Sequence, residues 1–418
     1  MSLSILRRNR NFRWLMSATA VSNLGDGVSA VAFPWLASLV TRDPVLISLV
    51  AVATRAPWLL LSLPAGVWTD RMDRRALMVR ADLFRCLLTC GIVALVLAAP
   101  PPVANEGAMI AGLCAVAFLL GSAEVLRDNA AQTVLPAVVD TGELEAANGQ
   151  LWSVERVMGA FVGPPLAGVL IALSLPVPFA FDAMTFALAA GLIWLMVIPA
   201  RVTRMRDGFW VELRAGMAWI WGHVVIWRLA IMLGVYNAAH MAGLTMLVLF
   251  AQEVLGLDAL GYGALLTLGA AGGVIGGLIA PGVAARLGGT ASLRVTLAVS
   301  TVAFLLIGFA WAPWMVGLAL VLEGLAGMLW NVVTVSFRQR TIPDDLLGRV
   351  NSVYRFFGWG MMPVGALLGG AAVAWLEPSL GREAALRSPY LGAACVTVAL
   401  GLVALVALRL PERRAYPD

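Results

Sequence analysis

The chain has 418 residues, of which 61% are apolar and 13% are charged, with a formal net charge of +5. Soluble globular domains carry about 25% charged residues, so this composition excludes a soluble protein and indicates one that spans a membrane many times. All 29 basic residues are arginines, and most fall in alternate loops, as membrane topology requires. The positive charge therefore needs no nucleic acid or other acidic partner to explain it.

Apolar runs of about 20 residues, each long enough to cross the hydrocarbon core of a bilayer, recur along the chain. The first run follows a basic segment and shows no small-residue cleavage site, so we predict a retained span and not a signal peptide. Twelve transmembrane helices are predicted, over residues 14–40, 45–68, 76–99, 107–127, 149–173, 178–199, 228–252, 260–285, 291–311, 314–337, 350–376 and 387–408.

The arginines also predict the orientation of the chain. Four of them precede the first helix, and every second loop is short and nearly free of basic residues. By the positive-inside rule, both termini then lie in the cytoplasm. We expect a multi-pass protein of a bacterial inner or plasma membrane, acting as a monomer.

Two charged residues lie deep in the first two predicted helices. Counted at 1.5 Å per residue, Asp26 lies about 18 Å into the first helix and Arg55 about 15 Å into the second from the opposite side. A charge at the bilayer centre costs roughly 2.5–3.5 kcal/mol or more. We therefore predict an ion pair whose partnership changes when Asp26 is protonated, with a structural salt bridge as the alternative. Asp82 and Arg85, one turn apart in the third helix, are expected to form a local structural pair.

The loop between the second and third helices contains the motif Gly66-Val-Trp-Thr-Asp70-Arg71-Met-Asp-Arg74-Arg75. It resembles the G-x-x-x-D-R-x-G-R-R signature of the major facilitator superfamily, except that Asp73 stands where a glycine is common. The resemblance implies a network that clasps the cytoplasmic side and loosens when the transporter opens inward. A plain positively charged loop is the alternative. The predicted members of the network are Gly66, Asp70, Arg71, Arg74, Arg75, Glu124 and Asp128.

The fifth helix contains Gly159-Ala-Phe-Val-Gly163-Pro164-Pro165-Leu-Ala-Gly168. This stretch resembles the antiporter signature G-x-x-x-G-P-x-x-G-G of the same superfamily, with Ala167 in place of one glycine. Small residues four apart let helices approach closely, and a proline removes a backbone hydrogen bond and kinks the span. A hinge for rocking between two states is predicted here, with generic helix packing as the alternative. The predicted hinge residues are Gly159, Gly163, Pro164 and Gly168.

The longest break between apolar runs, residues 201–225, interleaves arginines with aromatic side chains. That pattern is typical of an amphipathic helix at a membrane interface, and we favour it over binding of calmodulin or nucleic acid. The break separates a six-helix half over residues 1–200 from a second half over residues 226–418.

The two halves repeat each other weakly. Asn23 of the first helix matches Asn237 of the seventh, and the arginine–proline pair of the fifth helix recurs at the same spacing in the eleventh. Duplicated six-helix halves are a transporter architecture with the binding site at the midplane between them. The expected fold is therefore all-α, with twelve transmembrane helices in two pseudo-symmetric halves, the major facilitator fold.

Two polar residues of the second half lie at mid-helix depth, His240 in the seventh helix and Glu323 in the tenth. Histidine titrates near neutral pH unless perturbed, so these two are further candidates for proton coupling, with a hydrogen-bonded packing role as the alternative. By resemblance, helices one, four, seven and ten line the central cavity. Aromatic residues with a few polar groups suit amphipathic ligands, including cations. The predicted cavity residues are Asn23, Tyr236, Asn237, Trp330, Asn331, Phe357 and Trp359.

No constellation of residues points to catalysis. The sequence has no H-E-x-x-H motif, no phosphate-binding Gly-Lys-Ser/Thr loop and no aqueous domain for a cofactor. The four cysteines lie in apolar segments without metal-ligand spacing, and we expect them to behave as buried hydrophobic residues. We therefore expect no enzyme activity, no cofactor and no metal, and transport driven by an ion gradient.

Further segments resemble one branch of the superfamily, the macrolide-efflux and siderophore-exporter group. They include Ser22-Asn-Leu-Gly-Asp26, Leu144-Glu-Ala-Ala-Asn148 and Phe181-Asp-Ala-Met-Thr-Phe186. The resemblance covers nearly the whole chain and implies proton-driven export of amphipathic small molecules by alternating access. An importer or a lipid or lysolipid flippase of the same fold is the main alternative, and a transporter-like sensor is a lesser one.

Overall fold

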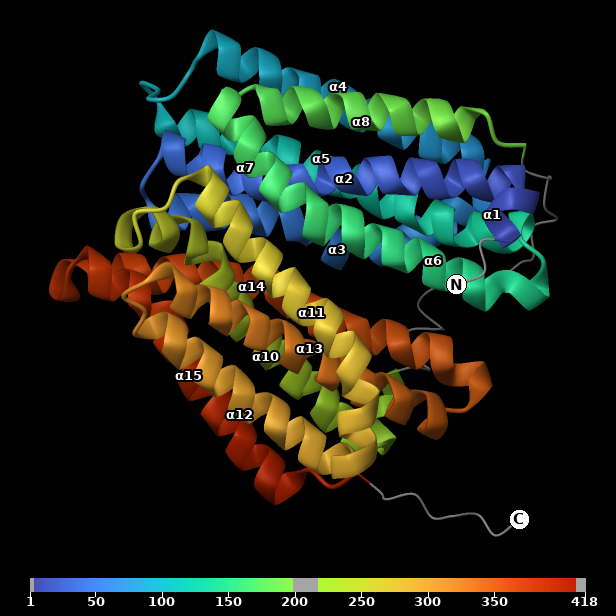
Figure 1. The fold of residues 1–418 in the computed structure, drawn as a ribbon. Coiled ribbons are helices and arrows are strands. Elements are labelled where there is room, and N and C mark those ends of the chain that lie inside the picture. Colours follow the sequence, from blue (N-terminus) through green and yellow to red (C-terminus); the bar gives the residue numbers. More distant parts are fainter. Residues whose placement is uncertain (1–3, 198–216, 411–418) are drawn as a thin grey trace. The chain divides into compact units, whose positions relative to one another are not determined.

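The computed structural model describes residues 4–197 and 217–410, apart from a few side chains within these ranges. All regular structure in this part of the chain is helical (Figure 1). Eleven helical segments of the described chain are long and apolar enough to cross a membrane. A twelfth long segment, α2 (Arg10–Val40), carries the polar residues Asn23 and Asp26. The predicted all-helical membrane fold is confirmed.

The helices form two compact units. The first unit comprises Met1–Arg206 together with Leu257–Thr267, and the second comprises Asp207–Gly256 together with Leu268–Asp418. Most of the predicted interfacial linker lies outside the described residues, although residues 217–222 are helical.

Polar N-caps begin several helices of the first unit. Asp73, which stands where the loop motif commonly has a glycine, accepts a hydrogen bond from the Ala76 amide at 2.7 Å and so caps the next helix. Asp43 caps the preceding helix in the same way. The helices of this unit are α1 Ser4–Arg8, α2 Arg10–Val40, α3 Pro44–Arg71, α4 Arg74–Ala98, α5 Glu106–Val138, α6 Leu144–Glu155, α7 Gly163–Leu173 and α8 Val177–Trp194.

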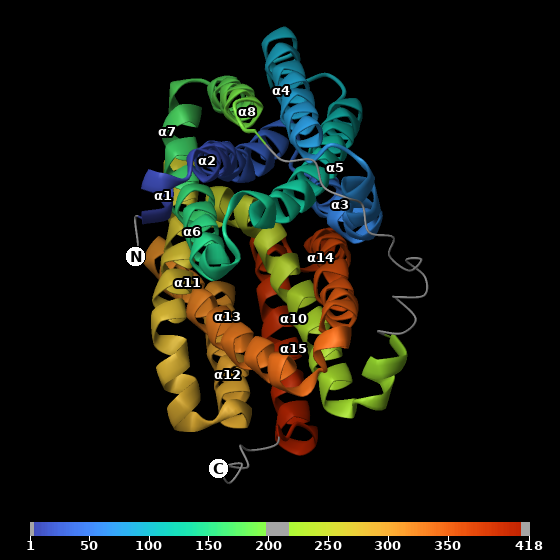
Figure 2. The ribbon, with the colours of Figure 1, turned by 90° about the vertical axis from the view of Figure 1, so that its right-hand side faces the viewer.

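Packing within the first unit brings α2 against α7 and α8, α4 against α5 and α8, and α3 against α5 (Figure 2). One face of each helix supplies apolar side chains to a shared core, which the spacing of the helix turn makes possible. This packing places several polar residues of α2, α4, α5 and α8 inside the unit. Core residues include Phe12, Leu15, Met78, Val134 and Ile193.

The helices of the second unit are joined by tight turns. Gly288 and Gly381 have φ angles of 78° and 79°, a conformation that favours glycine, and each directly precedes the next helix. The first residues of α11 belong to the first unit. The bounds are α10 Val224–Leu249, α11 Ala259–Leu287, α12 Gly289–Gly308, α13 Pro313–Thr341, α14 Asp344–Leu380 and α15 Arg382–Ala407.

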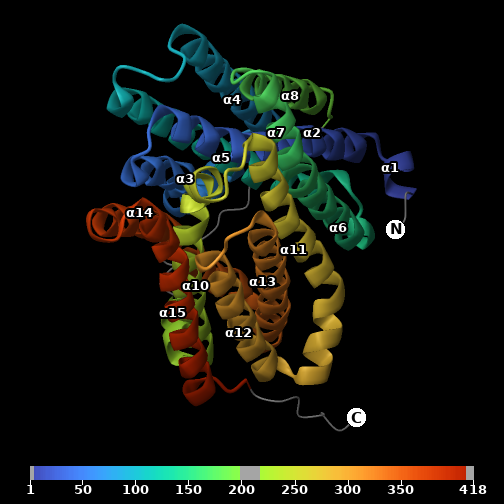
Figure 3. The same ribbon diagram turned by 60° about the vertical axis from the view of Figure 1, so that its left-hand side comes forward.

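In the second unit, α10 packs against α14 and α15, and α12 packs against α13 and α15 (Figure 3). Its core contains Leu229, Met232, Trp330, Val333 and Tyr354. Trp330, which we predicted to line a substrate cavity, lies within this core. The indole is 5% exposed, as expected for a large ring that gains most from burial.

The predicted end of the fourth membrane helix, at residue 127, is wrong. α5 continues to Val138, because buried Val134 and Leu135 extend its apolar face beyond the polar residues. Glu124 and Asp128 therefore lie inside the helix and not at its end. The position of Glu124 and Asp128 along α5 determines which charged side chains of neighbouring helices they can contact.

Candidate functional site

A network of buried charges lies inside the first unit, around Asp26 of α2. The guanidinium of Arg85 on α4 forms an ion pair with the Asp26 carboxylate, and its Nη1 lies 3.4 Å from the Ser22 hydroxyl. The side chain of Arg85 is 3% exposed and that of Asp26 is 28% exposed. Asp26 is therefore the more exposed partner of this ion pair.

A second arginine, Arg127 of α5, extends the network. Its Nε lies 3.3 Å from Oδ1 of Asp82, and its Nη1 lies 3.4 Å from Oδ1 of Asp128. Asp82 is fully buried and also lies 3.9 Å from Nη1 of Arg85. Buried charges are tolerated when nearby partners compensate for the lost hydration. The predicted local pair of Asp82 and Arg85 is thus part of a larger network that joins α2, α4 and α5.

A third buried carboxylate belongs to Asp182 of α8, which is 1% exposed. It accepts a hydrogen bond from the hydroxyl of Ser29, one turn from Asp26 on α2. A Cβ at Gly25 would lie 2.2 Å from Oδ1 of Asp182, so glycine is needed for this carboxylate to fit beside α2. The motif around Asp182 was noticed in the sequence, but its contact with α2 was not predicted.

The structure corrects the predicted partner of Asp26. Arg55 lies on an exposed face of α3, whereas Arg85 reaches Asp26 from α4. The prediction rested on depth along each helix, and depth does not determine which face a residue occupies. The length of the arginine side chain lets α4 supply the partner.

Arg74 and Arg75, the first two residues of α4, contact backbone carbonyl groups. Nη1 of Arg74 donates to the carbonyl oxygen of Thr133 on α5 at 2.9 Å. Nη1 of Arg75 donates to that of Met196, after α8, at 2.8 Å. The beginning of α4 is therefore bound to two other segments of the first unit. Of the other predicted members, Gly66 and the side chains of Asp70 and Arg71 lie outside the described part.

The predicted hinge contains an irregular helical turn. Residues Arg156–Val162 form a π-helix, and α7 begins directly after it at Gly163. A Cβ at Gly163 would lie 2.6 Å from the Cα of Gly27, and a Cβ at Gly27 would lie 2.2 Å from the carbonyl oxygen of Gly159. π-helical turns are rare and occur frequently at functional sites. The sequence predicted close packing and a proline kink here, and the π-helix was not predicted.

The remaining hinge residues contact the beginning of α11, within the first unit. A Cβ at Gly168 would lie 2.6 Å from the Cα of Leu260. A Cβ at Gly263 would lie 2.4 Å from the carbonyl oxygen of Pro164. Backbones that approach this closely exclude any larger residue from these positions.

A smaller polar cluster lies in the second unit around Glu323 of α13, which is 6% exposed. Its Oε2 accepts a hydrogen bond from the Tyr236 hydroxyl at 2.6 Å and lies 3.2 Å from Nδ1 of His240. The Tyr236 hydroxyl also lies 3.1 Å from Oγ of Ser300 on α12. The structure thus brings together Glu323 and His240, adds Tyr236 from the predicted cavity set, and reveals Ser300, which sequence analysis missed.

Two of the predicted cavity residues occupy helix crossings. The carbonyl oxygen of Asn23 lies 3.3 Å from a Cβ built at Gly159. Nδ2 of Asn237 donates to the carbonyl oxygen of Gly358 at 2.8 Å. In each unit, an asparagine of the first long helix therefore lies against a glycine of another helix. The two asparagines, Asn23 and Asn237, occupy equivalent positions in the sequence repeat. Of the other cavity residues, Phe357 packs against the core of the second unit, and Asn331 and Trp359 are exposed.

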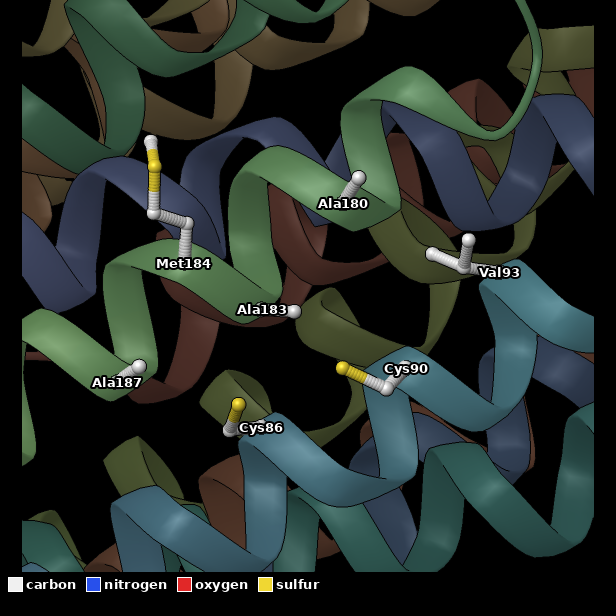
Figure 4. Close-up of a pocket in the computed structure, with 7 residues that line it drawn as sticks. All are labelled: Cys86, Cys90, Val93, Ala180, Ala183, Met184 and Ala187. Carbon is white, nitrogen blue, oxygen red and sulfur yellow. The ribbon is translucent and has the colours of Figure 1, made fainter.

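An apolar groove lies between α4 and α8 (Figure 4). Its lining has no charged side chain, so it offers no proton-binding carboxylate. The expectation that all cysteines are buried is wrong, because Cys90, in this groove, and Cys395 are exposed on membrane-spanning helices. The lining residues are Cys86, Cys90, Val93, Ala180, Ala183, Met184 and Ala187.

Solved structures of transporters share this fold. The nucleoside transporter NupG superposes with a TM-score of 0.76 at 11% identity, covering 95% of this chain and 100% of NupG. A bacterial homologue of the iron transporter ferroportin superposes with a TM-score of 0.71 at 17% identity, covering 95% of this chain and 99% of the homologue.

Sequence comparison extends the likeness to efflux proteins. The multidrug efflux pump Tap of Mycobacterium tuberculosis is 27% identical over 427 residues, covering 96% of this chain and 93% of Tap. Tap of Mycolicibacterium fortuitum is 24% identical over 424 residues, covering 95% of this chain and 96% of that protein. The profile of the transmembrane secretion effector family matches residues 2–417. The chain therefore belongs to the transmembrane secretion effector family of the major facilitator superfamily, whose members are transporters and not enzymes.

Proposed function

We propose that the protein exports amphipathic small molecules, such as drug-like compounds, a siderophore or another secondary metabolite, in exchange for protons. The observation that carries the proposal is the ion pair between partly exposed Asp26 and buried Arg85. In such a pair, the partly exposed carboxylate can exchange protons, whereas the guanidinium stays charged and buried. The similarity to the multidrug efflux pump Tap supports the direction of transport.

In the proposed cycle, protonation of Asp26 removes the negative charge that compensates Arg85. A buried guanidinium that loses its partner is strongly destabilising, so the network around it must rearrange. A proton can drive a conformational change only if it interacts differently with the two states, and breaking this ion pair provides that difference. The π-helical hinge next to α2 is the segment in which we place the resulting movement.

Alternating access then involves the two six-helix halves, residues 1–200 and 226–418, joined by the linker over residues 201–225. We place the monomeric protein in the plasma membrane with both termini in the cytoplasm. The alternate clustering of arginines supports this orientation.

Asp26→Asn is expected to abolish proton-driven efflux without lowering the amount of protein in the membrane. Asparagine keeps the size of aspartate but cannot bind and release a proton. Transport would be measured as accumulation of a fluorescent dye in proteoliposomes with an imposed pH gradient. Glu106→Gln, which neutralises an exposed acid in the first turn of α5, is the matched control and should behave as wild type. Efflux by Asp26→Asn with unchanged pH dependence would contradict the proposal.

We assign a second proton-coupling role to Glu323 and His240. Glu323→Gln should lower the number of protons exchanged per substrate, because the amide cannot carry a proton beside Tyr236 and His240. The measurement is the steady-state substrate gradient at several imposed pH gradients. Tyr236→Phe removes one hydrogen bond to Glu323 and keeps the carboxylate, so it should leave that ratio unchanged. An equal ratio in wild type and Glu323→Gln would show that the cluster serves packing only.

The cargo and the direction can be tested together. Reconstituted protein would be offered drugs, siderophores and lysolipids in counterflow, with and without a pH gradient. Export of an amphipathic drug against its gradient supports the proposal, whereas transport of lysolipids alone would favour a flippase.

A further inference from the structure

The first unit holds more buried carboxylates than its arginines can compensate. Arg127 lies beside both Asp82 and Asp128, which leaves Arg85 to compensate three further acids, Asp26, Glu124 and Asp182. Arg85 forms its ion pair with Asp26. Within the described residues, no ion pair joins Asp182 to an arginine, and its oxygens instead meet the hydroxyl groups of Ser29 and Thr185.

An ionised carboxylate without a counter-charge is very costly to bury. Asp182 is 1% exposed, so it cannot rely on water as Asp26 can. Three carboxylates and one guanidinium form a neutral group only if two of the carboxylates carry protons. While Arg85 is paired with Asp26, one of these protons belongs on Asp182.

Arg85 is placed to serve either acid. Its guanidinium lies over the ring of Phe186 on α8, 3.9 Å from the centroid, and Phe186 is one helical turn from Asp182. Residues four apart share one face of a helix, so a short movement of the guanidinium along α8 leads towards Asp182. Ser29, on the same helix as Asp26, already donates its hydroxyl hydrogen to Asp182.

We propose that Asp182 is a second proton-binding carboxylate of the transport cycle, protonated while Arg85 is paired with Asp26 and ionised when Arg85 is released. This inference rests on the proposed proton-driven export. A proton that binds Asp26 frees Arg85 to compensate Asp182, and the proton leaving Asp182 passes through the partly exposed Ser29 hydroxyl to water. One proton is bound and one is released, so the charge of the group stays constant.

The surroundings of Asp182 contain few other groups that could set its protonation. The titratable groups that interact electrostatically with Asp182 are Asp26 on α2 and Arg85 and Cys86 on α4. Neither α7 nor the rest of α8 contributes a titratable residue. The protonation of Asp182 therefore depends on its burial and on the charges of both Asp26 and Arg85.

The decisive experiment compares two modes of transport in proteoliposomes containing Asp182→Asn. Asparagine mimics the protonated state permanently, so proton-driven efflux should be lost. Substrate counterflow, which needs no net proton movement, should persist at a rate similar to wild type. Glu106→Gln again serves as the control. Wild-type proton-driven efflux by Asp182→Asn would overturn the inference, as would loss of both modes in a correctly folded variant.

A second variant, Ser29→Ala, covers the case in which Asp182→Asn does not fold. It keeps the carboxylate but removes the hydroxyl that stabilises its ionised form. The pH profile of efflux should move towards higher pH, by about one unit or less for a single hydrogen bond. An unchanged profile would overturn the inference. Absence of proton-driven efflux in the wild type would instead refute the proposed function itself, so the two failures are distinguishable.

Discussion

Gly27→Ala is expected to abolish transport, although it adds only one methyl group. A Cβ at this position would lie 2.2 Å from the carbonyl oxygen of Gly159 and 3.0 Å from its Cα. Backbone atoms cannot move aside as the end of a flexible side chain can, so α2 must separate from the π-helix. Inserting a methyl group into such packing typically costs about 1–3 kcal/mol, and here the strain falls on the proposed hinge.

The measurement is the rate of dye efflux, corrected for the amount of protein in the membrane. Gly91→Ala on α4 is the matched control, because a Cβ there has no atom within 4 Å. Gly365→Ala tests the corresponding crossing in the second unit, where the added Cβ would lie 2.1 Å from the carbonyl oxygen of Ala238. Wild-type efflux by Gly27→Ala would mean that the close approach of α2 is not required for transport.

The positions of the helices could be predicted from the sequence because lipid requires long apolar runs. The ends were predicted less well where charges interrupt such a run. Arg127 and Asp128 marked an apparent helix end, but they are paired with each other inside α5, so the backbone continues through them. Hydropathy records that a residue is charged and cannot show that the protein already compensates the charge.

Only part of the candidate site could be predicted from the sequence. The cost of a charge at membrane depth directed attention to Asp26, which forms an ion pair with Arg85 in the structure. Its partner was missed because depth gives no information about the face of the helix. Arg85 and Asp182 meet α2 only because α8 packs against both α2 and α4, and a single sequence does not reveal which helices are neighbours. In the second unit, His240 and Glu323 were selected for their similar depth, and the structure places them in contact, which was not predicted.

Arg85→Met is expected to destabilise the protein by about 3–5 kcal/mol, the cost of removing one partner from a buried ion pair. Methionine retains much of the length of arginine and packs in an apolar site. The loss of stability therefore reflects mainly the loss of the positive charge. Asp26 and Asp82 would both lose the nearby guanidinium. Thermal unfolding in detergent, followed by tryptophan fluorescence, would measure the effect as a lower melting temperature. Arg8→Met is the control, because its ion pair with Glu143 is exposed and such pairs contribute little.

The double variant Asp26→Asn with Arg85→Met separates the charge from the packing. If Arg85 stabilises the unit by compensating Asp26, neutralising the acid should restore part of the lost stability, and the two single effects should not add. Only part should return, because Asp82 retains its charge and its contact with Arg127. Strict additivity would mean that Arg85 and Asp26 act independently, and protonation of Asp26 could then not release Arg85 as the proposed transport cycle requires. The stability measurement therefore tests the coupling step without depending on knowledge of the substrate.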